Sequence, residues 1–296
     1  MRLGRKASTA RDARWDRLAG VIDVDALRDR HVVVVGVGSG GSTVALELAK
    51  AGVGRFTLID PDVVEETNLI RHECDDRYLG WNKAEAVADL IAHRNPRAHV
   101  DAISADAFEP KVGIDRIVAD AALIAACTDA ERPKHQLNRR CLEAGVPAVY
   151  GGVYEGGVGG EIVRVRPDSD AACYACVTSV LKEATPVPGA DGELDYGLID
   201  ADGVLHGAPG LGLDVRLVAT LHAKIALLTL LTDADGASDD VADVPANAVM
   251  FGTAPVEGLF PRHFTTVLMD IARQDGCLVC APYRAAARNR SQALIS

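Results

Sequence analysis

The sequence lacks two features that would direct a protein to nucleic acid or to a membrane. Its 296 residues carry a formal net charge of −11, whereas a nucleic-acid surface normally needs a basic patch. No apolar run follows the basic N-terminal residues, which argues against a secretory signal. The one long apolar segment, 210–231, is interrupted by Asp214, Arg216, His222 and Lys224, which favours a buried or half-buried helix over a membrane span. We therefore expect a cytoplasmic protein with no membrane or nucleic-acid partner.

A disulfide framework is also missing, because seven cysteines are an odd number in a chain that we expect to be cytosolic. Four of them form two C-x-x-C pairs, Cys173 with Cys176 and Cys277 with Cys280. Such pairs fit a tetrahedral four-thiolate zinc site, which is structural because it has no open position. A redox C-x-x-C is the alternative. We expect neither pair at a strand-to-helix turn, which favours zinc.

The order of apolar and amphipathic segments predicts an α/β protein. Strands are expected at 31–36, 55–60, 98–103, 121–127 and 146–151, alternating with helices at 39–51, 82–93 and 131–144. This alternation is typical of a Rossmann-like, mostly parallel sheet with helices on both faces. Beyond Tyr150 the sequence continues with a glycine-rich turn and with strands in which apolar and polar residues alternate. This pattern predicts an antiparallel C-terminal part.

The stretch "HVVVVGVGSGGSTVALELAKAGVGRFTLID" reads as strand, glycine turn, helix and second strand. Gly36 and Gly38 let the chain turn and let backbone N–H groups approach a phosphate, and Gly41 permits close packing of helix on strand. Asp60 ends the second strand, where it can accept hydrogen bonds from a ribose. The pattern predicts a nucleotide site without naming the nucleotide. A nicotinamide dehydrogenase is the first interpretation, and an ordinary glycine-rich turn is the alternative.

Four polar residues downstream weaken the dehydrogenase interpretation. Asn68 and Arg71 follow the Asp60 strand, and arginine suits a phosphate under attack because its planar fork holds two oxygens. Lys83 opens a helix, where the helix dipole disfavours a cation unless it binds an anion. Asp129 follows an apolar strand at the edge where ligands bind in α/β sheets. It is interpreted equally well as a Mg²⁺ ligand or as the N-cap of the next helix.

Together these residues resemble one family, the ThiF/MoeB/HesA adenylyltransferases, which are bacterial relatives of ubiquitin-activating enzyme. The resemblance runs from about Arg14 to Cys280. The residues that carry it are Gly36-x-Gly38-x-x-Gly41, Asp60-Pro-Asp62, Asn68-Leu-Ile-Arg71, Lys83, Cys127-Thr-Asp129, Gln136-Leu-Asn138 and the two C-x-x-C pairs.

The resemblance implies ATP-dependent adenylation of a carboxylate, usually the C-terminal glycine of a ubiquitin-like sulfur carrier. It implies that Asp60 binds the ATP ribose, with Asp62 among the nucleotide-binding residues. It also implies that Asn68, Arg71 and Lys83 bind the phosphates and that Asp129 holds Mg²⁺. Family members use an N-terminal arginine in the partner subunit's site; the nearest match here is Arg14-Trp15-Asp16-Arg17, which nominates Arg17 and implies a homodimer.

The chain departs from many relatives in one respect, since it has no cysteine between Cys176 and Cys277. We therefore expect adenylation without a thioester on a crossover-loop cysteine. Cys74 is the only lone cysteine considered reactive, and an incidental thiol is the favoured reading. Cys127 and Cys141 are expected in the core, and His206 at the surface.

Other functions stay open. The adenylated carboxylate could belong to a peptide natural-product precursor or to a modified tRNA, and a catalytically silent scaffold would bind nucleotide and a ubiquitin-like partner without chemistry. The expected organisation is one continuous domain with flanking segments. It consists of a disordered N-terminus at 1–10, a helical arm at 11–30, an ATP-binding half at 31–151, a C-terminal half at 152–280 with a crossover loop at 181–209, and a tail at 281–296.

Overall fold

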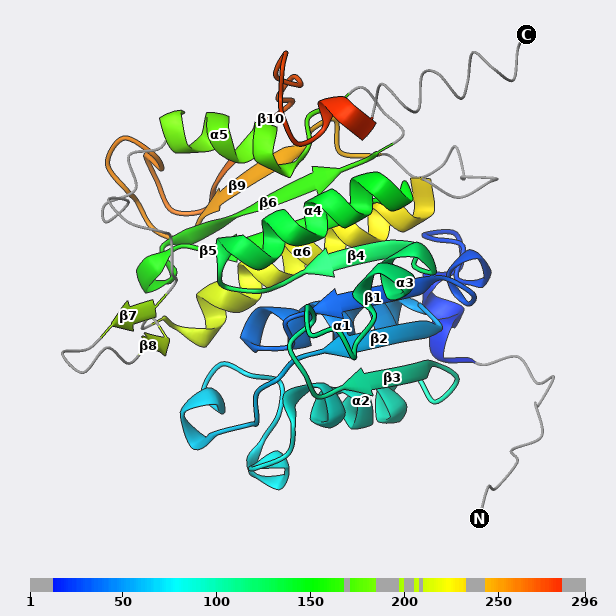
Figure 1. Ribbon diagram of the computed structural model, residues 1–296. Helices are drawn as coiled ribbons and strands as arrows, with labels where there is room; N and C mark the ends of the chain where they lie inside the picture. Colours follow the sequence, from blue (N-terminus) through cyan, green and yellow to red (C-terminus); the bar gives the residue numbers. More distant parts are fainter. Residues whose placement is uncertain are drawn as a thin grey trace, which may run out of the picture.

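The computed structural model describes residues 13–167, 171–184, 197–199, 205–207, 210–232 and 243–283. Its centre is an eight-stranded sheet with the order β10-β9-β6-β5-β4-β1-β2-β3. Helices cover both faces of this sheet (Figure 1). The predicted fold class, a mostly parallel α/β sheet continued by antiparallel strands, is confirmed.

The parallel half contains the expected alternation of strands and helices. Strands β1 to β5 pair in parallel in the order β3-β2-β1-β4-β5. The chain reverses its direction of winding between β1 and β4, which is where ligands bind in open α/β sheets. The elements are β1 (His31–Val35), α1 (Ser39–Ala51), β2 (Arg55–Ile59), α2 (Lys83–Arg94), β3 (His99–Ile103), α3 (Ile114–Ala119), β4 (Leu123–Ala126), α4 (Glu131–Ala144) and β5 (Ala148–Val153). Only the short helix α3 was not predicted.

The second half adds β6 (Gly159–Val165), β9 (Ala248–Gly252) and β10 (Thr265–Met269), all in antiparallel pairs. Helices α5 (Tyr174–Ala184) and α6 (Gly212–Thr232) pack on the sheet, and β7 (Gly197–Ile199) pairs with β8 (Leu205–Gly207). The crossover loop was expected to begin at residue 181, which is wrong because α5 continues to Ala184. The rest of that loop lies outside the described residues except for β7 and β8.

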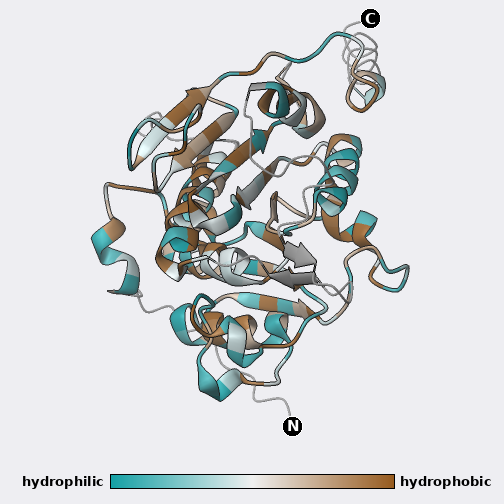
Figure 2. Ribbon diagram, turned by 90° about the vertical axis from the view of Figure 1, so that its left-hand side faces the viewer, coloured by the Kyte–Doolittle hydropathy of each residue, from teal (hydrophilic) through white to brown (hydrophobic). Residues whose placement is uncertain are grey.

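The inner strands of the sheet contribute to two separate cores because their side chains alternate between its faces. Val32 and Val34 pack with α1, α2 and α6, whereas Val33 and Val35 pack with α3, α4 and α5. The apolar run 31–35 is therefore buried on both sides, as expected for a parallel strand between two helical layers. Figure 2 shows hydrophobic residues along the inner strands and more hydrophilic residues on the outer helices and loops.

Helix α6 is apolar and long enough to cross a membrane, but its neighbours identify it as a core helix. Of its most apolar 18-residue window, 61% is buried inside the protein. Two glycines of the sheet let it approach closely: a Cβ on Gly151 would clash with the His222 ring, and one on Gly160 would lie 2.6 Å from Val218. The predicted buried helix at 210–231 is thus confirmed.

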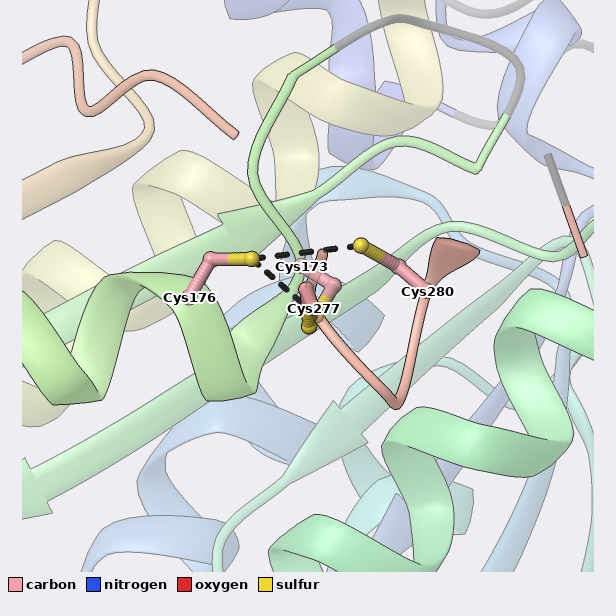
Figure 3. Close-up of side chains that lie close together, drawn as sticks. All are labelled: Cys173, Cys176, Cys277 and Cys280. Carbon is pink, nitrogen blue, oxygen red and sulfur yellow. Dashed lines mark hydrogen bonds between the residues drawn. The ribbon is translucent and has the colours of Figure 1, made fainter. Parts of the chain in front are cut away.

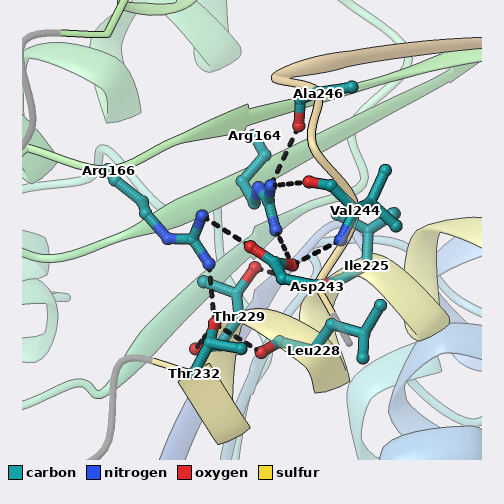
Figure 4. A network of polar contacts seen from close by, with 9 residues as sticks. All are labelled: Arg164, Arg166, Ile225, Leu228, Thr229, Thr232, Asp243, Val244 and Ala246. Atoms are coloured by element: carbon teal, nitrogen blue, oxygen red, sulfur yellow. Dashed lines mark hydrogen bonds and ion pairs between the residues drawn. The ribbon is translucent and has the colours of Figure 1, made fainter. Parts of the chain in front are cut away.

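An ion-pair network joins the ends of α6 and β6 to the segment before β9 (Figure 4). The buried Arg164 guanidinium pairs with Asp243 Oδ1 at 2.6 Å and donates to the carbonyls of Val244 and Ala246. Arg166 pairs with the other Asp243 oxygen and donates to Thr232 Oγ1 at 2.7 Å. The buried Arg164 charge is compensated because a carboxylate and two carbonyls accept from its N–H groups.

The N-terminal arm was expected to be helical at 11–30, and within its described residues it forms two short 3-10 helices, Ala13–Leu18 and Asp25–Leu27. Gly20, with φ 78°, follows the first turn. Asp23 Oδ1 then accepts from the N–H groups of Asp25 and Ala26 and starts the second. The arm lies beside the far end of α1, where Trp15 Nε1 donates to Lys50 O at 2.8 Å.

Candidate functional site

The glycine turn after β1 packs tightly against the loop after β4. Gly36 has φ 85°, and a Cβ there would lie 2.8 Å from the Cys127 carbonyl. A Cβ on Gly41 would clash with the Gly36 carbonyl oxygen. A Cβ on Gly38 would meet nothing within 4 Å, and Gly38 lines a cavity. The first and third glycines are therefore required by packing, while the second leaves space for a ligand at the N-terminus of α1.

The turn is held by hydrogen bonds to both sides of the Val37 backbone. Its N–H donates to Asp60 Oδ2 at 2.6 Å, and its carbonyl accepts from His72 Nε2 at 2.8 Å. His72 Nδ1 accepts from Cys74 N at 3.1 Å, which assigns the ring proton to Nε2. Burial lowers the pKa of His72, so the ring is neutral at pH 7. Burial raises the pKa of Asp60, opposed by the N–H groups of Val37 and Asp62.

Asn82 places Lys83 at the cavity. Its side-chain oxygen caps α2 by accepting from Ala84 N at 2.9 Å, and its Nδ2 donates to the carbonyls of Asp60 and Asp62, each at 2.9 Å. Lys83 Nζ then pairs with Asp62 Oδ2 at 2.9 Å. This carboxylate and the cap offset the unfavourable position of a cation at a helix N-terminus. Asn82 was not predicted, although an asparagine directly before a helix is a readable N-cap signal.

The loop that carries Asn68 and Arg71 is fastened at several points. Asn68 Oδ1 accepts from Glu65 N at 3.1 Å, and Arg71 N donates to Asn68 O at 3.0 Å. Two residues further on, Glu73 accepts from Thr43 Oγ1 on α1 at 3.0 Å and pairs with Arg216 on α6 at 3.1 Å. The phosphate-binding candidates are therefore carried on a loop that is tied to α1 and α6, two of the helices on one face of the sheet.

Asp129 lies between β4 and α4 and is not the N-cap of that helix. The N-cap is Ala130, and no side chain caps it, so the capping interpretation is wrong. The Asp129 side chain is accessible through the cavity. Surrounding protein raises its pKa by desolvation, while Lys134, Arg71 and Lys83 lower it. An accessible carboxylate among cations is a suitable oxygen ligand for Mg²⁺.

One cavity of about 370 Å³ collects most of the predicted site residues. It opens at the carboxyl ends of β1, β2 and β4, as expected for a ligand site in this topology. Gly41 lies beneath it, packed on Gly36. The predicted residues that line it are Gly36, Gly38, Asp60, Asp62, Asn68, Arg71, Lys83 and Asp129.

Arg17 is not brought to the cavity of its own chain. It is exposed, and its neighbour Trp15 binds the carbonyl of Lys50 near the C-terminal end of α1. The glycine turn lies at the opposite end of this 13-residue helix, which is about 20 Å long. Any role for Arg17 in adenylation therefore requires a second copy of the chain, as the resemblance implies.

The floor of the cavity contains a thiol–imidazole pair that was not predicted. Cys127 Sγ lies 3.8 Å from His222 Nδ1, and His222 Nε2 lies 3.1 Å from Val149 O. Burial raises the pKa of Cys127 to about 12 and lowers that of His222 to about 4. Both groups are therefore neutral at pH 7. No local sequence signal marks His222, because it lies within an apolar helix far along the chain.

The other lone cysteines are buried as well. Burial raises the pKa of Cys74 to about 12, and the same cause raises that of Cys141 to about 12. Cys74 is only 3% exposed. Neither thiol is a ready nucleophile, because the thiolate is the reactive form. His206 lies in β8, and its side chain is outside the described residues.

The four C-x-x-C cysteines converge in a cluster (Figure 3). Their four Sγ atoms lie within 4.8 Å of one another. The Cys173–Cys176, Cys173–Cys277 and Cys176–Cys280 sulfur distances are 3.8, 3.9 and 3.9 Å. Zinc–sulfur bonds of about 2.3 Å in a tetrahedron require sulfur atoms about 3.8 Å apart.

Two further observations support a metal at this cluster. Burial opposes ionisation of Cys277, but the backbone N–H groups of Cys280 and Val279 lower its pKa to about 7. Burial raises the pKa of Cys173 to about 11, and the neighbouring Asn138 side chain opposes this rise. The buried Nδ2 of Asn138 has no partner in hydrogen-bonding geometry among the described residues. A zinc-bound thiolate would be the acceptor that this amide needs.

The expectation that neither C-x-x-C pair lies at a strand-to-helix turn is wrong for the first pair. Cys173 directly precedes α5 and Cys176 lies in its first turn, so this pair does lie where a strand-to-helix connection ends. The zinc interpretation instead rests on the convergence of both pairs, since a redox site requires only one.

Comparisons with known proteins agree on one family. The model of the ThiF family matches residues 9–246. The molybdopterin-synthase adenylyltransferase of Escherichia coli (strain K12) is 32% identical over 160 residues, which are 54% of this chain and 63% of that protein. The SAMP-activating enzyme E1 of Haloferax volcanii is 29% identical over 231 residues, 77% of each chain. The chain thus spans less than two thirds of the first of these relatives.

Solved structures share the fold. Escherichia coli MccB with SeMet MccA superimposes with a TM-score of 0.66 at 20% identity, covering 93% of this chain and 75% of that chain. Escherichia coli MccB with ATP superimposes with a TM-score of 0.63 at 18% identity, covering 92% and 75%.

Proposed function

The chain belongs to the ThiF family, and on that premise we propose that it is an adenylyltransferase. It activates the C-terminal carboxylate of a small ubiquitin-like or sulfur-carrier protein, using ATP and Mg²⁺, and yields an acyl-adenylate and pyrophosphate. The names of its relatives support this reaction, because one is a molybdopterin-synthase adenylyltransferase and another a SAMP-activating enzyme.

One observation carries the proposal: two cations and an accessible carboxylate share a cavity with a helix N-terminus. Arg71, Lys83 and Asp129 all line the cavity that Gly38 opens at the start of α1. A carboxylate that attacks a phosphate brings two anions together, so the site must hold positive charge in place beforehand. A hydride-transfer enzyme has no such requirement.

The reaction then follows from these positions. A carboxylate oxygen of the acyl donor attacks the α-phosphorus, and the bond from that phosphorus to the bridging oxygen breaks. Its electron pair leaves with pyrophosphate. Arg71 and Lys83 hold the non-bridging phosphate oxygens, and Asp60 accepts from the ribose hydroxyls. Mg²⁺, bound by Asp129, would add positive charge at the phosphates.

We also propose that the acyl group leaves this site as the adenylate. The sequence has no cysteine between Cys176 and Cys277. The three cysteines outside the cluster have pKa values raised to about 12 by burial. Neither the loop nor the cavity floor thus supplies a thiolate for a thioester.

The active species is proposed to be a homodimer in the cytoplasm. Arg17 lies about one helix length from its own cavity, and its guanidinium would complete the cavity of the partner chain. Arg17→Ala and Lys83→Ala protein can be mixed so that the two variants form mixed dimers. If Arg17 and Lys83 act in one site from different copies, the mixture should recover part of the adenylation activity.

Pyrophosphate exchange into ATP tests the reaction. Exchange should appear only with a cognate carrier, and Asp129→Ala should abolish it. Asp76→Ala is the control, because Asp76 is an exposed acid outside the cavity. Undiminished exchange in Asp129→Ala would refute the metal assignment. Preferential binding of NADH over ATP would refute the reaction itself.

A second candidate keeps the chemistry and changes the acyl donor to a peptide. The fold likeness to the microcin C7 biosynthetic enzyme MccB, seen with N-formylated MccA, favours it over a tRNA carboxylate. Exchange that depends on a peptide and not on any carrier protein would select it. Nucleotide binding without exchange for every carboxylate tried would instead indicate a scaffold.

A further inference from the structure

Tyr174 links the four-cysteine cluster to the start of the helix that follows Asp129. It lies between Cys173 and Cys176 in sequence and is 1% exposed. Its hydroxyl donates to Glu131 Oε1 at 2.9 Å and lies 3.0 Å from Oε2. Glu131 is the first residue of α4, two positions after Asp129.

The same residue holds α4 at a second point. Tyr174 N donates to Asn138 Oδ1 at 3.2 Å. Glu131 and Asn138 are seven residues apart on α4, so they lie on one face about two turns from each other. The tyrosine thus contacts α4 at its cavity end through the hydroxyl and near the cluster through the backbone.

Glu131 in turn engages a buried cation. Lys134, 1% exposed, pairs with Glu131 Oε1 at 3.1 Å. The charge of Lys134 acts on Asp129. A shift of Glu131 would therefore change both the position of the first turn of α4 and the charge that faces Asp129.

We propose that Tyr174 is a positioning residue that holds the first turn of α4, and with it Asp129, in register with the four-cysteine cluster. Zinc at the cluster then serves adenylation from a distance by fixing Tyr174. This inference rests on the proposed function for its catalytic consequence, whereas the mechanical link rests on the contacts alone.

The test uses zinc-loaded full-length protein and the variant Tyr174→Phe, which keeps the ring and removes the hydroxyl. Tyr150→Phe is the matched control, because Tyr150 is also buried, stacks on Tyr174 with ring centroids 4.3 Å apart, and its hydroxyl has no oxygen or nitrogen partner among the described residues. Zinc content is measured in both variants.

Amide hydrogen exchange measures directly whether Tyr174 holds the first turn of α4. In Tyr174→Phe, exchange of the amides of residues 135–138 should accelerate about tenfold, because the hydrogen bond to the Glu131 carboxylate is lost. Tyr150→Phe should exchange like the wild type. Removal of zinc by a chelator should accelerate the same amides. Unchanged exchange in Tyr174→Phe, or loss of zinc from it, would overturn the proposal.

The Mg²⁺ dependence of ATP binding tests the predicted effect on Asp129. ATP binding is measured by calorimetry at increasing Mg²⁺ concentrations. The Mg²⁺ concentration that gives half of the maximal ATP affinity should rise about tenfold in Tyr174→Phe, with zinc still bound. An unchanged value despite faster amide exchange would overturn the effect on Asp129. If the wild type binds ATP but performs no pyrophosphate exchange, the proposed reaction fails while the link is still decided by the amides.

Discussion

The nucleotide cavity and the four-cysteine cluster lie against the same helix, α4, but they are built in opposite ways. The cavity gathers charged side chains along an open wall, and hydrogen bonds from side chains to the backbone hold the turns that carry them. The cluster gathers four thiols whose sulfur atoms converge within 4.8 Å of one another, and three of the four residues are buried. An open set of charges can bind and transform a ligand, whereas a closed set of four ligands can only hold a metal.

The difference predicts which loss each region tolerates. A change in the cavity removes a group that acts on the ligand, so the rate falls and the fold persists. A change in the cluster removes a cross-link between residues 173–176 and 277–280, so the fold weakens first. The following experiments would sharpen or break this contrast.

The largest effect is expected at the cluster. Cys280→Ser should abolish stoichiometric zinc and lower the unfolding free energy by on the order of 5 kcal/mol, part of the roughly 10–16 kcal/mol that structural zinc contributes in small peptides. Metal analysis and urea unfolding measure both. Cys74→Ala, a buried thiol outside the cluster, should keep its zinc. If the urea midpoint of unfolding were the same in zinc-free and zinc-loaded protein, zinc would have no structural role.

Next in size is the loss of a cation from the cavity. Lys83→Ala should lower the rate of pyrophosphate exchange about 10²–10³-fold, as expected for one preorganised group facing developing charge. Its melting temperature should stay near that of the wild type. Arg77→Ala is the control, because Arg77 is exposed and pairs only locally with Asp75. Equal exchange in the two variants would contradict the assignment of Lys83.

Acid should weaken the cavity floor through His222. Burial holds its folded pKa at about 4, below the ordinary histidine value of 6.5, so only the unfolded chain takes up the proton between these values. The stability from the neutral ring is complete above pH 6.5 and is lost as pH falls towards 4, about 3 kcal/mol in total. In His222→Gln the decline between pH 7 and 4.5 should be shallower. Parallel urea-unfolding curves for the two proteins at every pH would exclude this role.

The smallest effect is expected at Asp62. Its pair with Lys83 spans 2.9 Å, but the carboxylate is 64% exposed, and exposed pairs contribute at most about 1 kcal/mol. Asp62→Asn should therefore leave the unfolding free energy within about 0.5 kcal/mol of the wild type. A loss of several kcal/mol, seen in urea unfolding, would show that the pair is a structural element of the cavity wall.

Much of the cavity could be predicted because its residues follow local patterns. Gly36 and Gly41 are required by a strand-to-helix turn, and Asp60, Arg71 and Asp129 each follow a strand whose carboxyl end faces the ligand edge. The four cysteines could be paired by their spacing. Predictions failed where packing decides, as in α3 and in α5 beyond residue 181.

The sequence by itself determined the strand–turn–helix with its glycine turn and the types of side chain placed after each strand, because both depend on a few neighbouring residues. Only the tertiary structure decided that His72 and Asp60 clamp Val37, that His222 forms the cavity floor, and that Tyr174 joins the cluster to α4. Those contacts connect residues 23 to 95 positions apart. Their partners are chosen by the packing of helices on the sheet, which no short pattern encodes.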